Sequence, residues 1–352
     1  MYAGSYPSIA HKDTITQTVS GSFSLGYSPH RCSNLTVSSV RRAVIDIGTN
    51  SVKVLVADIS GLQVSPILED SRQTRLGQGF YESHHLQPDP IRKTAEAVAE
   101  FSEICRQQKV ESIRVIATSA ARDAVNARDL VEAIGRASGL DVEIISGEQE
   151  ADWAYKGVTS NLDLAKHPLL LLDVGGGSTE FILGHGEQTD LRHSFPLGAV
   201  RLMERLPTTD PPGVEGLEDC RAWLKHFLHE EVRPRLEPEL RNEARHGGRR
   251  DILLVGTGWT TTILARMEAK LENYDRNRIE AVRLTRPQVT AHLENLWSLP
   301  LAERKRLPGL PPLRADVILT GVAIYESVML EFGFSELRVS TRGLRFAALM
   351  PE

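Results

Sequence analysis

From residue 41 onward, the hydrophobic positions change repeatedly from the spacing of strands to the spacing of helices. Short apolar or alternating runs predict strands at 43–48, 52–59, 63–70, 113–118 and 142–145. Helical spacing predicts helices at 90–108, 127–135 and 148–157. This order of elements is typical of a mixed sheet with helices packed on it.

The second half of the chain opens as the first half does, with a pair of strands within 170–183. Further strands are predicted at 251–255 and 336–339. Helices are predicted at 217–232, 236–246, 261–271, 287–296 and 316–332, and Pro234 separates the first two. The similar openings of the two halves indicate an internal duplication. Such a chain forms a cleft between similar domains, where ligands tend to bind.

The two opening hairpins share one arrangement of residues. Each has a buried strand that ends in an Asp, then a turn of Gly, Ser or Thr, then an apolar return strand. The Asp residues are Asp46 and Asp173, and the turns contain Gly48, Thr49, Asn50, Ser51, Gly175, Gly176, Gly177, Ser178 and Thr179. Glycine lets backbone N–H groups converge on an anion, and a neighbouring Asp can hold a divalent cation that bridges phosphate oxygens. Either hairpin alone is equally compatible with a phosphate-binding turn and with an ordinary Gly turn. The matching pair favours a phosphate site in which the two turns face each other.

Composition excludes several classes of protein. The chain has 352 residues, a net charge of -5 and no apolar run near the roughly 18 residues that a membrane helix needs. The mild negative charge attracts no polyanion over a distance, so we expect neither a nucleic-acid nor a membrane partner, and an anionic substrate must be held by local groups. Three cysteines far apart in sequence predict reduced thiols in the cytoplasm. The oligomeric state, monomer or homodimer, stays open.

Residues 1–41 differ from the rest of the chain. They are rich in Ser, Thr, Gly and Tyr, have few acidic residues and show no periodicity. A targeting peptide has a similar composition, but basic residues are sparse and an apolar core is lacking. The pattern favours a disordered N-terminal extension or a start site assigned too far upstream.

Several segments in a fixed order resemble one known family. With Gly256, Thr257 and Gly258 as a third loop, the hairpins resemble the actin/hexokinase/chaperone ATPase superfamily. Within that superfamily, the sequence is similar to the exopolyphosphatase/guanosine pentaphosphate phosphohydrolase family from about residue 43 to 350. The segments that carry this resemblance are ATSAARDAVN at 117–126, EIISGEQEA at 143–151, FPLGAVR at 195–201, RADVI at 314–318 and STRGLR at 340–345.

The resemblance implies a fold and a division into domains. It implies an α/β protein of two actin-like (ribonuclease H-like) domains, each a mixed sheet flanked by helices, with a cleft between them. We expect domain I at 42–148, domain II at 149–338 and a C-terminal segment, 339–352, that packs back on domain I. Longer members of the family add a C-terminal helical HD-type domain, which we do not expect in this protein.

The resemblance also implies a chemistry, the Mg²⁺-dependent hydrolysis of a terminal phosphoanhydride in inorganic polyphosphate or guanosine pentaphosphate. Glu150 matches the glutamate that prepares the attacking water, and Arg122 matches an arginine near the substrate phosphates. Asp173 matches the aspartate of the metal site, Glu180 follows on the same hairpin, and Asp46 is the counterpart of Asp173 on the first hairpin. We do not expect Mg²⁺ to bind all three directly. The residues by themselves leave alternatives: Glu150 can simply favour the start of a helix, and Arg122 can pair with Asp123 or Asp129 at the surface.

Two other functions compete with this one. A metabolite kinase of the same superfamily would need an adenosine pocket, yet Trp259 follows the third loop where many relatives have a small residue. The indole can fill a base pocket or stack on a base, and the sequence does not decide between them. A regulator that binds polyphosphate or an alarmone without hydrolysis would be favoured if a catalytic carboxylate were missing, but Glu150, Asp173 and Glu180 are present.

Overall fold

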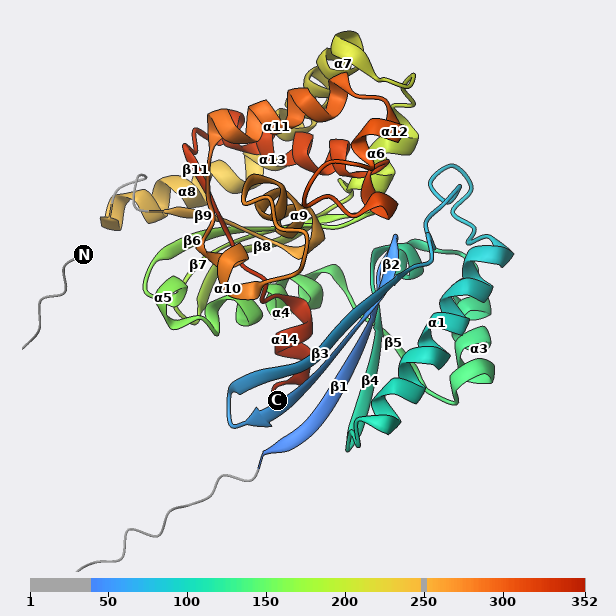
Figure 1. Ribbon diagram of the computed structural model, residues 1–352. Helices are drawn as coiled ribbons and strands as arrows, with labels where there is room; N and C mark the ends of the chain where they lie inside the picture. The colour runs from blue at the N-terminus through green and yellow to red at the C-terminus, as the bar shows by residue number, and fades with distance from the viewer. Residues whose placement is uncertain (1–38, 248–251, 352) are drawn as a thin grey trace, which may run out of the picture. The chain divides into compact units, whose positions relative to one another are not determined.

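The computed structural model describes residues 39–247 and 252–351, which belong to one compact unit, Ser38–Glu352. The extension expected at 1–41 therefore lies almost wholly outside the described residues, as does the start of the strand expected at 251. Two mixed sheets form the framework, and helices flank both (Figure 1). This is the fold class that the sequence predicts.

The first sheet has the strand order β3-β2-β1-β4-β5. Its strands are β1 (Val40–Ile47), β2 (Ser51–Ser60), β3 (Gln63–Gln73), β4 (Ser112–Ala117) and β5 (Val142–Ile144). Strand β1 is antiparallel to β2 and parallel to β4, because a short turn joins the first pair and a helix joins β3 to β4. The helices of this half are α1 (Pro88–Gln107), α2 (Ser119–Asp123) and α3 (Ala127–Ser138).

The second sheet has the order β10-β11-β9-β6-β7-β8. Its strands are β6 (Pro168–Val174), β7 (Thr179–His185), β8 (Gln188–Phe195), β9 (Leu253–Thr257), β10 (Arg283–Thr285) and β11 (Glu336–Val339). Strand β6 is antiparallel to β7 and parallel to β9, which repeats the arrangement of β1, β2 and β4. The two Asp residues occupy equivalent places, since Asp46 pairs with Lys53 and Asp173 pairs with Glu180. The duplication is therefore visible in the strand pairing.

Most helices pack around the second sheet. They are α4 (Gly147–Thr159), α5 (Leu162–Ala165), α6 (Ala199–Arg205), α7 (Gly213–Phe227), α8 (Arg233–Gly247), α9 (Gly258–Glu268), α10 (Arg276–Ala281), α11 (Arg286–Ser298), α12 (Leu301–Arg304) and α13 (Ile318–Phe332). Helix α13 is apolar on nearly every side and is buried in the larger hydrophobic core. None of the helices within the described ranges combines the length and the apolarity that crossing a bilayer requires.

The break expected at Pro234 is wrong. Helix α7 continues through one π-helical turn, Leu228–Val232, into α8. The backbone N–H of Arg233 donates to Leu228 O, five residues back, and Pro234 then lies in the first turn of α8. The π-helical turn accommodates Pro234, which has no N–H to donate, because it shifts the hydrogen bonding of the helix just before that residue. Strand β8, helix α6 and the last helix, Leu344–Leu349, were also not predicted from the sequence.

The last helix, α14 (Leu344–Leu349), lies beside α4 and the first sheet (Figure 1). Its apolar residues Leu344 and Phe346 share a buried cluster with Val44 and Leu55 of that sheet. A close approach fixes this position, because a Cβ on Gly157 of α4 would lie 2.1 Å from Gly343 O. The division into domains at residues 148 and 338 stays a prediction.

Candidate active site

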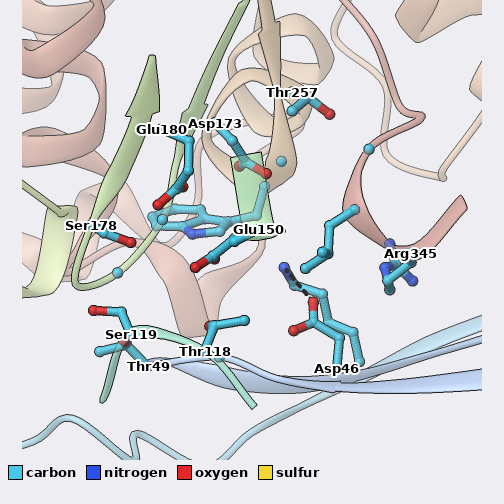
Figure 2. A pocket seen from close by; sticks show the side chains of 18 of the residues that line it. Asp46, Thr49, Thr118, Ser119, Glu150, Asp173, Ser178, Glu180, Thr257 and Arg345 are labelled. Carbon is cyan, nitrogen blue, oxygen red and sulfur yellow. Dashed lines mark ion pairs between the residues drawn. The ribbon is translucent and has the colours of Figure 1, made fainter. Parts of the chain in front are cut away.

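The two Gly turns face each other across one cavity of about 90 Å³. Figure 2 shows Asp46, Thr49, Thr118 and Ser119 on one side of this cavity and Asp173, Ser178, Glu180 and Thr257 on the other, with Glu150 between them. The predicted site residues that line it are Asp46, Gly48, Thr49, Asn50, Ser51, Glu150, Asp173, Gly175, Gly176, Gly177, Ser178, Glu180, Thr257 and Gly258. Residues more than 200 positions apart in sequence thus meet at one place.

The two turns have the same hydrogen bond. Gly48 N donates to Ser51 O at 3.0 Å, and Gly175 N donates to Ser178 O at 2.9 Å. The turns also approach each other so closely that side chains are excluded: a Cβ on Gly176 would lie 2.8 Å from Thr49 Cβ. Ser119 Oγ and Asn50 Nδ2 are buried and have no hydrogen-bond partner among the described residues. Buried donors without partners are costly in a protein, so they fit a site that an anion completes.

Glu150 lies in the first turn of α4, which Ser146 caps by accepting a hydrogen bond from Gln149 N at 3.1 Å. Its carboxylate is 8% exposed and accepts a hydrogen bond from Arg122 Nη1 at 2.9 Å. Burial raises the pKa of Glu150 to about 7, and the positive charge of Arg122 opposes this rise. A carboxyl with a pKa near neutral pH is suited to accept a proton.

Asp173 and Glu180 face each other on the second hairpin. Burial raises the pKa of Asp173 to about 6, and burial together with the charge of Glu150 raises the pKa of Glu180 well above its usual value. Ser194 Oγ donates to Glu180 Oε1 at 2.7 Å, whereas no described residue donates a hydrogen bond to Asp173. The cavity therefore gathers carboxylates whose negative charges are only partly compensated.

Such a donor set fits a divalent cation. Among the residues at 39–247 and 252–351, no three His, Cys, Asp or Glu side chains come together as a complete metal-binding cluster. Mg²⁺ does not need one, because it binds through one or two carboxylates and takes its other ligands from water and phosphate. Asp46 is partly neutralised by Lys53 Nζ at 3.9 Å, so the unpaired Asp173 is the better candidate for the first ligand.

Three predicted site residues do not line the cavity. The Arg122 guanidinium lies behind Glu150, held by that carboxylate and by Ile145 O at 3.3 Å, with Asp123 3.9 Å away. The Thr179 hydroxyl is fully buried and donates to Leu197 O. Gly256 lies within β9, where a Cβ would be 2.2 Å from Thr261 Cγ2. For the last two, the structure indicates packing roles in place of phosphate contact.

Several lining residues were not predicted from the sequence. Thr118 and Ser119 lie at the start of α2, just after β4, as Thr257 and Gly258 lie at the end of β9 and the start of α9, so they are the counterpart of the third loop in the first half. The duplication was the signal that could have identified them. Lys53, Thr341 and Arg345 also line the cavity. Thr341 and Arg345 belong to the STRGLR segment at 340–345, and its resemblance to the family was the signal that could have identified them.

Comparisons with known proteins show which family has this sequence and fold. The model of the Ppx/GppA phosphatase family matches residues 55–350. The chain belongs to the Ppx/GppA phosphatase family. Exopolyphosphatase 2 of Mycobacterium tuberculosis is 33% identical to it over 314 residues, which are 85% of this chain and 94% of the relative.

Solved structures of the Ppx/GppA family share the fold over nearly the whole described chain. The Aquifex aeolicus PPX-GPPA enzyme is 33% identical and superposes with a TM-score of 0.69, covering 89% of this chain and 99% of its own. An exopolyphosphatase from Cytophaga hutchinsonii is 26% identical with a TM-score of 0.77, covering 88% of this chain and 96% of its own. The resemblance stated from the motifs is therefore confirmed as family membership, and the fold is the actin-like fold of this family.

Proposed function

We propose that this protein is an exopolyphosphatase, which releases orthophosphate from the end of inorganic polyphosphate. The observation that carries the proposal is the cavity itself, in which two matched Gly turns face the buried carboxylate of Glu150. Relatives named exopolyphosphatase support the choice of substrate. The size of the cavity, about 90 Å³, also suits one or two phosphate groups better than a larger organic ligand.

Catalysis is expected to depend on positioning and on charge. The backbone N–H groups and hydroxyls of the two turns hold the terminal phosphate, and Glu150 accepts a proton from a water molecule. The water oxygen forms a bond to the terminal phosphorus while the bond from that phosphorus to the bridging oxygen breaks. Orthophosphate and a chain shorter by one phosphate result. Arg122 keeps the Glu150 carboxylate oriented through the 2.9 Å hydrogen bond.

Asp173 would be the first carboxylate ligand of Mg²⁺, and Glu180 and Asp46, which line the same cavity, would take part directly or through water. When bound, the ion would neutralise negative charge on the phosphate oxygens. Lys53 Nζ lies 3.9 Å from Asp46, and burial lowers the pKa of this lysine while the charge of Asp46 opposes the change.

The test is phosphate release by the purified chain with Mg²⁺ from polyphosphate, guanosine pentaphosphate and ATP at equal concentrations of terminal phosphate. Glu150→Gln should abolish most turnover. Glu148→Gln is the matched control, since Glu148 lies exposed in the same turn of α4. Release mainly from polyphosphate supports the proposal, and equal release from both Gln variants contradicts the role of Glu150.

Guanosine pentaphosphate is the second candidate substrate, because it presents the same terminal phosphoanhydride and because the family description names both enzyme types. Release mainly from this nucleotide would replace polyphosphate as the substrate. Binding of either compound without any release would indicate a regulatory protein, and phosphorylation of a metabolite by ATP would indicate a kinase.

A further inference from the structure

One lining residue of the cavity has no role in the reaction described above. Trp259 is the second residue of α9 and follows Gly258 directly. Gly258 has a φ of 84°, and a Cβ there would lie 2.4 Å from Asp173 Oδ1. The indole of Trp259 therefore lines the cavity immediately beside the part of the site that holds the phosphate.

The indole is fixed in this position from several sides. It packs on an apolar cluster that includes Val200 and Val317, and Val200 N is bonded to the second Gly turn through Gly176 O at 2.8 Å. The guanidinium of Arg314 lies over the indole ring, 5.1 Å from its centroid. A side chain held by packing and by a cation–π contact does not swing aside to admit a ligand.

Arg314 is unusual in its own surroundings. It is 7% exposed, and its Nη1 has no hydrogen-bond partner among the described residues. Burial lowers the pKa of Arg314 to about 10, which leaves it charged at neutral pH. A desolvated cation gains more from an aromatic face than an exposed one, so Arg314 binds firmly to the indole and covers one of its faces. A purine cannot stack on the face that Arg314 covers.

The volume of the cavity points in the same direction. Pockets that enclose organic ligands measure roughly 300–1,000 Å³, whereas this cavity has about 90 Å³ with the indole in place. A row of phosphates is thin, but a ribose and a base beside it need an apolar space. On the α9 side, Trp259 occupies that space.

We propose that Trp259 is a specificity-determining residue. Fixed by Arg314, its indole closes the α9 side of the phosphate cavity to a nucleoside, so that the site favours a bare phosphate chain over a nucleotide of the same phosphate number. This inference rests on the proposed function for its substrate class, but it concerns binding and can be tested without turnover.

The test compares two ligands that differ only in the nucleoside, inorganic tripolyphosphate and ATP. Dissociation constants are measured by calorimetry with Mg²⁺ on the full chain carrying Glu150→Gln, with and without Trp259→Ala. We expect the ratio of the ATP constant to the tripolyphosphate constant to fall by at least about tenfold on removal of the indole. An unchanged ratio, or weaker ATP binding that shows the indole to stack on a base, would overturn the proposal.

Trp223→Ala is the matched control. Trp223 is also half-buried and lies under an arginine, Arg205, at 5.2 Å, but it does not line the cavity. Trp223→Ala should leave the ratio of the ATP constant to the tripolyphosphate constant unchanged. If thermal unfolding shows that Trp259→Ala does not fold, Trp259→Leu keeps apolar packing and should shift the ratio less but in the same direction. Phosphate release from polyphosphate by the wild type reports on the proposed function separately.

Discussion

Replacing Glu150 by Gln should remove activity and, at alkaline pH, make the unliganded protein more stable. The activity loss should be about 10²- to 10⁴-fold, which is the usual contribution of a positioned general base. The stability gain follows from burial, which raises the pKa of this carboxyl from 4.5 to about 7. A rise of this size corresponds to about 3 kcal/mol against the ionised form in the folded protein.

The sign of the pH dependence follows from proton binding. Between pH 4.5 and about 7 the folded protein binds a proton at Glu150 that the unfolded chain has released. The free energy of unfolding therefore falls as pH rises through this range, and the full cost of the buried charge is present above it. Glutamine carries no charge and escapes this cost. The pKa of about 7 already includes the opposing effect of Arg122, which lies 2.9 Å away.

Urea unfolding at pH 5 and at pH 8 measures the effect. At each pH the unfolding free energy of wild type is subtracted from that of Glu150→Gln. This difference should be about 2 kcal/mol larger at pH 8 than at pH 5. Glu148→Gln is the control variant, because it removes an exposed carboxylate from the same turn of α4. A variant that lost activity but showed the same difference at both pH values would refute the reasoning from burial. A variant that kept most of its turnover would refute the role as base.

Three further changes have distinct expected outcomes. Asp173→Asn should raise the Mg²⁺ concentration for half-maximal phosphate release by at least about tenfold, because an unpaired carboxylate is lost. An unchanged Mg²⁺ titration would count against Asp173 as a ligand. Gly258→Ala should lose most activity, because its Cβ would lie 2.4 Å from Asp173 Oδ1. Gly333 has a φ of 76° and open space around it, so Gly333→Ala should cost about 1 kcal/mol of stability and leave turnover intact. Burial raises the pKa of Cys105 to about 11 and that of Cys220 to about 12. Thiol reagents should therefore label both cysteines far more slowly in the native protein than in urea. Rapid labelling of the native protein would contradict their burial.

Local patterns were enough to locate the two hairpins. The strand-turn-strand signal at Asp46 and at Asp173 depends on residues close together in sequence, and the paired registers show the same arrangement in both halves. Local rules failed at Pro234, because one π-helical turn shifts the hydrogen bonding and lets the helix continue. The packing of Leu228, Val232 and Leu236 in the large core stabilises that continuation, and such packing is not visible in a window of sequence.

The sequence by itself determined the fold class, the two phosphate-type turns and the family, because each depends on short segments or on their order along the chain. Tertiary structure alone decided which groups meet. In the folded protein Arg122 lies behind Glu150, and Trp259 lies beneath Arg314. Thr179 and Gly256 pack within the protein and do not line the cavity. The physical reason is that charge compensation, burial and the free space around a ligand depend on distances between atoms, and residues far apart in the chain fix those distances only when the two sheets and their helices have packed.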